Sequence, residues 1–183
     1  MPPRMIAGFD EATNRHVYTP NTILIPVSGQ FAAQNNEVNG WGQLGPFDNT
    51  NSQDFGNYAS YTTLNNLQVG GLRFPFDVRF VEIDIIHRNN AGATDEWKWL
   101  IYTQEKTPGS TTRVTQLIYD GALNNYGNNE PQQTQIVAAD LIDPPNDTVL
   151  TAGHFWSLAV GTPTQAANRN IQCYGGWILF EVA

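Results

Sequence analysis

Ile171-Gln-Cys-Tyr-Gly-Gly-Trp-Ile-Leu-Phe-Glu-Val-Ala183 is the stretch that decides the fold of this chain of 183 residues. A segment this apolar predicts a β-strand that is buried on both faces, with Gly175 and Gly176 forming a bulge or a tight bend. We expect the chain to end in the middle of its own sheet and to build a closed β core, with no tail or second domain after it.

The composition favours β structure in a single domain. Hydrophobic residues make up 40% and aromatic residues 11% of the chain, which excludes disorder as the default state. Charged residues are only 14%, against roughly 25% in typical soluble domains. The only lysines are Lys98 and Lys106, whereas long surface helices usually carry many lysines and glutamates. Asn, Thr and Gln replace the missing charge, as expected for strands joined by polar loops.

The charge balance excludes two classes of partner. A formal net charge of −8 and a pI near 4.6 are unsuited to nucleic acid, whose binding needs a basic surface. An acidic chain without a long apolar run is equally unsuited to a membrane. The first residues lack the apolar segment of a secretory signal, so we expect synthesis in a cytoplasm. The single cysteine, Cys173, excludes an intrachain disulfide and is predicted to be a small core residue.

Residues 1–20 are predicted to form an extended N-terminal arm, and residues 21–183 a single β-sandwich domain. Prolines and Gly8 interrupt the arm, and its apolar residues follow no sustained period. An ordered terminus must be held by something, because free termini usually fray. We therefore expect the arm to contact a neighbouring subunit through Met5, Ile6, Phe9, Val17 and Tyr18.

The remaining sequence alternates short apolar runs with turn signals every 8–15 residues, which predicts an antiparallel β-sandwich. Residues 32–61 are predicted to hold short strands joined by long loops. The other expected strands are Asn21–Val27, Leu67–Phe74, Val78–His87, Trp97–Gln104, Arg113–Tyr119, Gln135–Ala139, Thr148–Leu150, His154–Gly161 and Ile171–Val182. The three strands within residues 78–119 are expected to pair consecutively as a meander.

Catalytic and metal-binding motifs are absent from the sequence. His16, His87 and His154 form no pair with metal-ligand spacing, and one cysteine cannot build a zinc site. No nucleophile elbow, phosphate loop or dinucleotide fingerprint occurs. Glu82 and Asp84 share one strand face, opposite Val81, Ile83 and Ile85, and are interpreted as a solvated outer face rather than a catalytic pair. We expect no enzyme activity, no cofactor and no metal.

Two polar loops leave alternatives open. Asp48–Asp54 spaces oxygen-bearing side chains as calcium loops do, but it lacks the central glycine and closing glutamate of an EF-hand. Asn124, Asn125, Tyr126 and Asn128 combine an aromatic ring with amides, a composition that suits a glycan and equally suits a turn. The five tryptophans are predicted to be mostly core or interface residues.

The segments Val149–Val160 and Tyr174–Val182 together resemble the closing hairpin of viral jelly rolls. In trimeric phage fibre tips and head decoration proteins, an entry segment like Val149–Gly153 leads into an apolar strand, and the final strand ends near the C-terminus. The resemblance covers about the last third of the chain. It implies a compact jelly roll, a homotrimer and attachment to a bacteriophage particle, and it brings no catalytic residues.

The expected function is that of a virion structural protein, a capsid decoration or cement protein that bridges adjacent subunits of the head. Its partners would be further copies of the chain and the major capsid protein or other virion proteins, and it would be located in the virion. A tail-fibre or spike tip that binds host-surface glycan is the alternative. A polysaccharide-degrading enzyme is a third reading, for which no convergent acid and base residues are found. In a cement protein the arm is essential and the distal loops are replaceable, whereas an adhesin shows the reverse.

Overall fold

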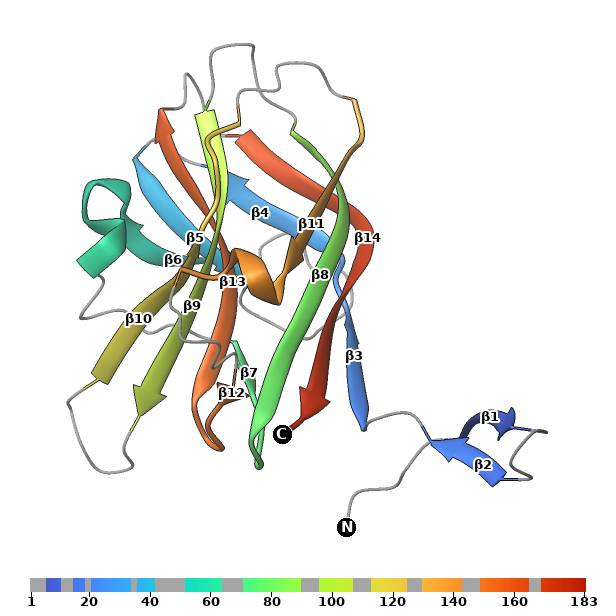
Figure 1. Ribbon diagram of the computed structural model, residues 1–183. Helices are drawn as coiled ribbons and strands as arrows, with labels where there is room; N and C mark the ends of the chain where they lie inside the picture. The colour runs from blue at the N-terminus through green and yellow to red at the C-terminus, as the bar shows by residue number, and fades with distance from the viewer. Residues whose placement is uncertain are drawn as a thin grey trace.

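The computed structural model describes residues 6–10, 15–18, 21–33, 36–41, 52–63, 71–89, 96–106, 113–124, 130–142, 149–164 and 169–183 (Figure 1). For strands β1, β2 and β6 it describes the backbone. No helix within these ranges has the length and apolar character needed to cross a membrane.

Almost every described element is a β-strand, so the prediction of an all-β chain is confirmed. The strands are β1 (Ile6–Asp10), β2 (Arg15–Tyr18), β3 (Thr22–Pro26), β4 (Gly29–Ala33), β5 (Glu37–Trp41), β6 (Ser52–Asn57), β7 (Leu72–Arg73), β8 (Val78–Asn89), β9 (Glu96–Lys106), β10 (Arg113–Asp120), β11 (Gln132–Val137), β12 (Val149–Leu150), β13 (Phe155–Thr164) and β14 (Arg169–Val182). Two short 3₁₀ helices, η1 (Tyr58–Thr63) and η2 (Ala138–Asp140), accompany them.

The strands form two antiparallel sheets that face each other as a sandwich (Figure 1). The first, here called the β14 sheet, has the order β11-β8-β14-β3, with β12 also paired to β8 and β4 also paired to β14. The second, the β13 sheet, has the order β10-β9-β13-β5-β6, with β7 also paired to β13. β3 and β4 pair with successive parts of the same edge of β14 and so act as one bent strand.

Two of the predicted strand pairings, β8 with β9 and β13 with β14, are wrong. The meander within residues 78–119 fails at its first link, because β8 lies in the β14 sheet and β9 in the β13 sheet; only the β9–β10 pairing is confirmed. Likewise β13 and β14 do not form a closing hairpin, since they belong to different sheets. Both edges of β8 are occupied by β11 and β14, and both edges of β9 by β10 and β13, which leaves β8 and β9 no edge to share.

β14 lies in the middle of its sheet, as expected, with β8 on one edge and β3 and β4 on the other. The prediction that it is buried on both faces is wrong. Ile178 and Phe180 are fully buried, but Trp177 is 38% exposed and Tyr174 is 52% exposed. A run in which every residue is apolar hides the alternation, so its outer face cannot be recognised from hydrophobicity alone.

Bulges change which side chains face the core. In β14 the pairing with β8 shifts between Cys173 and Gly175, so Tyr174 is the extra residue. In β8 the corresponding shift makes Val81 the extra residue. Val81, predicted to point inward with Ile83 and Ile85, is therefore only half-buried, and Phe80 takes the inner face instead.

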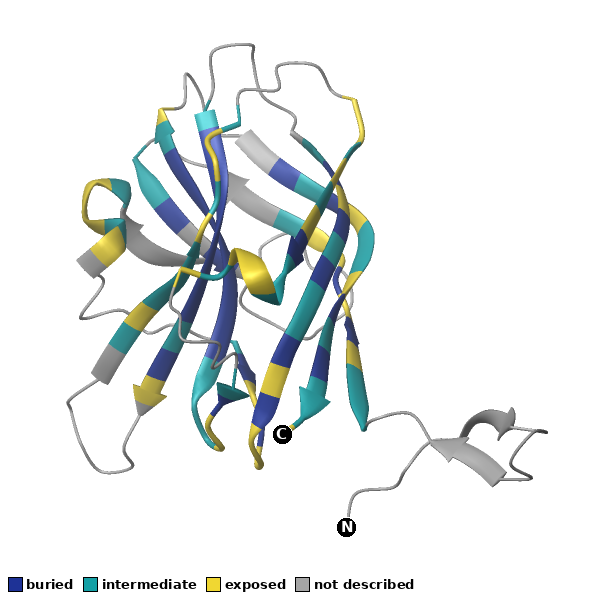
Figure 2. Ribbon diagram, in the orientation of Figure 1, coloured by how far each residue is buried: buried dark blue, intermediate teal, exposed yellow. Residues whose placement is uncertain are grey.

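The core fills the space between the two sheets (Figure 2). Its largest members are aromatic: the ring of Trp156 lies 5.4 Å from that of Phe180 and 6.0 Å from that of Phe80. Trp97 and Trp99 are also buried, which confirms the interpretation of these tryptophans as core residues. Cys173 is buried as predicted, and burial raises the pKa of its thiol to about 12.

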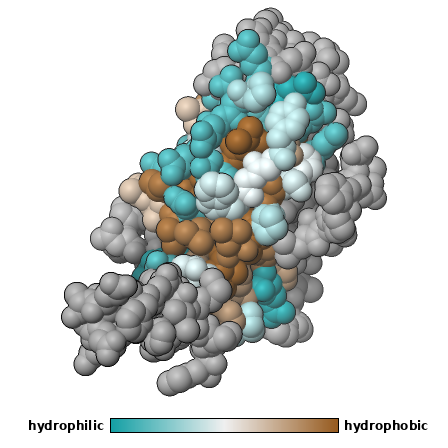
Figure 3. All heavy atoms as spheres, turned by 90° about the vertical axis from the view of Figure 1, so that its right-hand side faces the viewer, coloured by the Kyte–Doolittle hydropathy of each residue, from teal (hydrophilic) through white to brown (hydrophobic). Residues whose placement is uncertain are grey.

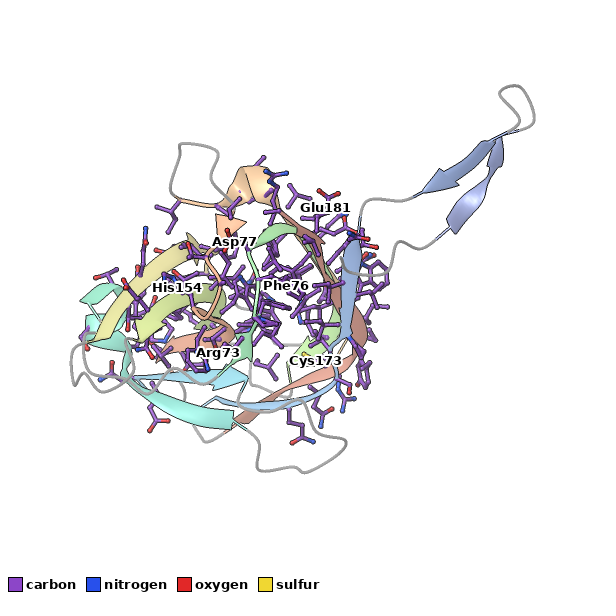
Figure 4. The ribbon with its side chains drawn as sticks, turned by 90° about the horizontal axis from the view of Figure 1, so that it is seen from below. Arg73, Phe76, Asp77, His154, Cys173 and Glu181 are labelled. Carbon is purple, nitrogen blue, oxygen red and sulfur yellow. The ribbon has the colours of Figure 1, made fainter. Side chains whose placement is uncertain are left out.

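At one end of the sandwich, hydrogen bonds that involve Arg73 and Asp77 fix the turn before β13. Arg73 Nε donates to the carbonyl of Gly153 at 2.9 Å, and the Ala152 amide donates to the Asp77 carboxylate at 2.7 Å (Figure 4). Gly153 has a φ of +83°, a conformation that suits glycine. These bonds connect β7 and the start of β8 to the segment that leads into β13.

β1 and β2 pair with each other as an antiparallel hairpin that joins neither large sheet. The pairing includes Ile6 with Tyr18 and Phe9 with His16, and its register shifts between Ile6 and Gly8. Figures 1 and 4 show the hairpin standing away from the sandwich, beyond the start of β3. The sequence did not indicate this pairing, because the irregular register interrupts the period-2 alternation.

Candidate interaction surface

The residues predicted to form the arm contact lie on the hairpin or outside the described residues. Ile6 and Phe9 belong to β1, and Val17 and Tyr18 to β2. Met5 lies outside the described residues. The hairpin thus groups four of the five predicted contact residues on one small unit, separate from the sandwich.

The predicted glycan loop is described only at its first residue. Asn124 exchanges two backbone hydrogen bonds with Trp97, at 2.8 and 3.0 Å, and its side-chain amide donates to the Ala122 carbonyl. Asn125, Tyr126 and Asn128 lie outside the described residues. Of the possible calcium loop, Ser52 to Asp54 begin strand β6, and the rest also lies outside them.

Glu82 and Asp84 lie on the outer face of the β14 sheet, as predicted. Gln133 donates to both oxygens of Asp84, at 2.9 and 3.0 Å, and Gln135 donates to Glu82. These are contacts between cross-strand neighbours on an outer face. Within the described ranges, no group of three or more His, Cys, Asp or Glu side chains is arranged to hold a metal ion.

His87 is buried between the sheets beside two tryptophans. Its ring lies 5.0 Å from Trp97 and 5.4 Å from Trp99, both edge-on, and its Nε2 is 2.8 Å from the hydroxyl of Thr134. Burial lowers the pKa of His87 to about 4. A neutral histidine in an aromatic core is a packing residue, which agrees with its interpretation as a hydrogen-bonded histidine.

The outer face of the β13 sheet is covered by η1. Tyr58 and Tyr61 of η1 stack with ring centroids 4.9 Å apart and pack on the small cluster Val38, Leu100, Tyr102 and Ala159. Gly161 leaves room for this cover, because a Cβ at that position would lie 2.9 Å from the Tyr58 ring. This chain therefore buries the apolar residues of one outer face by itself.

Lys98 closes the contact between η1 and the sheet. Its ammonium forms a salt bridge with Asp120, donates to the Tyr61 hydroxyl at 3.0 Å and lies 4.1 Å from the centre of the Tyr61 ring. The Tyr61 hydroxyl in turn donates to Asp120 at 2.9 Å. Burial alone lowers the pKa of Lys98, but hydrogen bonds to Asp120 and Tyr61 outweigh it and hold the pKa above its usual value.

The outer face of the β14 sheet, in contrast, presents exposed apolar side chains (Figure 3). Leu24 on β3 is 62% exposed, and it lies opposite Leu179 of β14 in the register. Trp177 lies two residues from Leu179 on the same face, and Ile86 of β8 is 47% exposed. We call Leu24, Tyr174, Trp177, Leu179 and Ile86 the outer apolar patch.

Polar contacts hold the large rings of this patch in place. The indole Nε1 of Trp177 donates to Glu82 at 3.2 Å. The guanidinium of Arg88 lies 5.6 Å from the centre of the Tyr174 ring and donates to Gln172 at 2.7 Å. Rings fixed in this way lose little side-chain entropy when a partner packs on them, which favours binding.

The sequence pattern did not reveal the patch. Leu24, Trp177 and Leu179 stand in runs that are apolar throughout, where exposed and buried residues look alike. Trp177 was included among the tryptophans expected in the core or at an interface, and among the four tryptophans whose side chains the structure describes it is the exposed one. An exposed tryptophan fits the interface part of that expectation.

Comparison with known proteins gives no family for this chain. No protein-family model matches it, and no curated protein matches it. Among solved structures, the chain is similar to one of cowpea mosaic virus, described as the naturally occurring empty particles of the top component. The alignment covers 91% of this chain and 89% of that chain at 14% sequence identity and a TM-score of 0.27. At this TM-score the likeness carries no argument about fold or function.

Proposed function

We propose that this chain is a virion structural protein with a jelly-roll fold. If the edge strand β6 and the two-residue strands β7 and β12 are left out, eight strand units follow one another along the chain: β3 with β4, β5, β8, β9, β10, β11, β13 and β14. The β14 sheet takes them in the order 1-8-3-6, and the β13 sheet in the order 2-7-4-5. This order supports a jelly roll, an architecture that occurs in viral capsid proteins and also in lectins and cupins.

The outer apolar patch is the observation that carries the structural role. Contiguous exposed apolar residues on one face are typical of a surface that contacts another protein. No group of metal-ligating side chains competes with it among the described residues. The side-chain amide of Asn124, the described part of the possible glycan loop, is engaged with its own chain. We therefore favour an assembly role over a glycan-binding role.

Within the virion we propose the role of a decoration, or cement, protein. Such a protein stabilises a shell by burying surface against adjacent subunits, at about 25 cal/mol for each Å² of apolar area. The charge-poor composition, 14% charged residues, suits extensive contacts because burying unpaired charges is costly. The net charge of −8 also disfavours adhesion to the packaged genome.

The test compares virus particles assembled with and without this chain. Quantitative mass spectrometry of purified particles gives the copy number of the chain relative to the main shell protein. A decoration protein is present in numbers comparable to the shell protein, and particles that lack it release their genome at a lower temperature. A fibre tip is present in few copies and leaves that temperature unchanged. Absence of the chain from particles overturns the proposal.

A further inference from the structure

The two outer faces of the sandwich differ in whether a described element covers their apolar residues. On the β13 sheet, η1 and the Lys98–Asp120 bridge cover the cluster around Leu100. On the β14 sheet, the outer apolar patch has no covering element among the described residues, and Leu24 is 62% exposed. The β3 strand that carries Leu24 is also the edge of its sheet. Within the part of the chain that the structure describes, this face therefore presents an apolar surface that a partner could cover.

The β1–β2 hairpin requires a partner for a different reason. Its strands, five and four residues long, pair only with each other. An isolated two-stranded hairpin is at best marginally stable in water and needs a third strand or a packing surface. The hairpin carries Ile6, Phe9, Val17 and Tyr18, so it has the apolar side chains with which to pack.

The distribution of charge favours a contact between this hairpin and a second copy of the sandwich. In residues 1–20, Arg4 and Arg15 balance Asp10 and Glu11, so the segment has a formal net charge of zero. The whole net charge of −8 therefore falls within residues 21–183. Two copies repel each other at long range through their sandwiches, and the neutral hairpin is the part of the chain that can contact a second sandwich without adding to that repulsion.

The connection between the hairpin and β3 is short. β2 ends at Tyr18 and β3 begins at Thr22, so few residues separate them. In Figures 1 and 4 the hairpin projects outward from the start of β3, while the patch extends from β3 across β14 to β8. A hairpin that stands clear of the sandwich on a short connection is accessible to a neighbouring molecule.

From these observations we infer that the outer apolar patch receives the N-terminal hairpin of a second copy of this chain. The contact is heterologous, since hairpin and patch are different surfaces, so it links copies head to tail or closes a ring. The inference rests on the proposed structural role and specifies the partner of the hairpin. It concerns the isolated protein, so its test is independent of whether the chain is found on a particle.

The experiment uses two full-length variants and measures mass by sedimentation velocity. Leu24→Asp places a charge in the patch and leaves the hairpin intact. Phe9→Asp places a charge in the hairpin and leaves the patch intact. We expect the wild type to associate, and each variant alone to associate about tenfold or more weakly, the effect of losing a central interface residue. Each variant alone then approaches the 20.3 kDa mass of one chain.

An equimolar mixture of the two variants tests whether the hairpin of one chain binds the outer apolar patch of another. The intact hairpin of the Leu24→Asp chain can still enter the intact patch of the Phe9→Asp chain. Titration of fluorescently labelled Leu24→Asp chain with Phe9→Asp chain is therefore expected to produce a 1:1 pair, twice the mass of one chain, with tighter binding than either variant shows alone. Failure of the mixture to pair overturns the inference, as does a wild type that stays monomeric at every concentration tested.

Leu123→Asp is the matched control, because Leu123 is 52% exposed and lies outside the patch. It is expected to change wild-type association less than twofold; an effect equal to that of Leu24→Asp overturns the inference. Circular dichroism of each variant confirms that it is folded. If the proposed virion role fails but the mixture pairs, the inference stands; if particles carry the chain but the mixture does not pair, only the inference falls.

Discussion

Lys98 and His87 are buried ionisable side chains that the protein accommodates in opposite ways. Lys98 keeps its charge, because Asp120 and the Tyr61 hydroxyl replace the water that burial removes. His87 has aromatic rings and one hydroxyl around it, and burial keeps it neutral. Each residue predicts a different response to mutation and to pH.

Asp120→Asn is expected to lower the free energy of unfolding by about 1–3 kcal/mol, because it leaves the buried Lys98 ammonium without its counter-charge. The range is below that of a fully buried pair because Asp120 is 29% exposed. The additional substitution Lys98→Met should recover part of the loss, since it removes the unpaired charge. Urea denaturation checks both results. Glu130→Gln, on an exposed carboxylate, is the control, and an equal effect of Asp120→Asn and Glu130→Gln would contradict the role of the pair.

His87 predicts a loss of stability in mild acid. Its pKa falls from an ordinary 6.5 to about 4 in the folded protein, so the unfolded chain binds the proton more tightly. The stability that His87 contributes is complete above pH 6.5 and is lost as the pH falls towards 4, a change of about 3 kcal/mol.

His87→Gln is expected to flatten this decline between pH 6.5 and pH 5, above the range where most carboxylates titrate. The measurement is the urea midpoint at a series of pH values for the wild type, His87→Gln and the control His154→Gln, which changes a histidine outside the core. A His87→Gln curve parallel to the wild type would show that another group is responsible.

At the scale of elements, β14 and β8 are the central strands of the β14 sheet, and their register depends on close backbone contact. A Cβ at Gly176 would lie 2.1 Å from the carbonyl oxygen of Asp84, whereas a Cβ at Gly175 would have no heavy atom within 4 Å. The neighbouring bulge at Tyr174 allows Cys173 and Ile178 both to face the core, although their spacing is odd. Of the two glycines, Gly176 is therefore the one that the close approach of β8 requires.

Gly176→Ala is expected to destabilise the protein by about 1–3 kcal/mol or more, because the strands must separate to admit the methyl group. Gly175→Ala should change stability by less than about 1 kcal/mol, in either direction. Guanidinium denaturation of the two variants checks this difference. Equal losses of stability at the two positions would mean that the close approach of β8 is not the reason for a glycine at position 176.

At the scale of the whole molecule, the two ends of the chain contribute unequally to the stability of the sandwich. The N-terminal hairpin makes no hydrogen-bonded pairing with either large sheet. The last residues, in contrast, place Ile178 and Phe180 in the core and pair on both edges of β14. Removing one end leaves the sandwich whole, and removing the other divides its central sheet.

A chain that begins at Asn21 is therefore expected to fold, with an unfolding midpoint close to that of the dilute full-length protein. A chain that stops at Gly176 is expected not to fold, because it loses the centre of one sheet and two fully buried side chains. Near-ultraviolet circular dichroism reports the packed tryptophans in each case. A folded, cooperative product from the shorter C-terminal chain would contradict the central position of β14.

Most strands could be located from the sequence, because runs such as Val78–His87 and Trp97–Gln104 alternate or cluster in ways that only a strand explains. The pairing of the strands could not be predicted from the sequence, because a strand such as β9 has the same hydrophobic pattern whichever sheet it joins. The candidate surface was also hidden. Leu24 and Trp177 lie in runs that are apolar on both faces, so their exposure depends on what covers the sheet.

The sequence by itself determined an all-β chain, a final strand in the middle of its sheet and a core rich in tryptophan, because local hydrophobic patterns and turn residues specify these features. Only the tertiary structure decided that consecutive strands cross between sheets, that bulges at Val81 and Tyr174 reverse the inward-facing side chains, and that no described segment covers the apolar outer face of the β14 sheet. Pairing and exposure depend on which distant segments meet, and that information is shared among many residues rather than held in any one stretch.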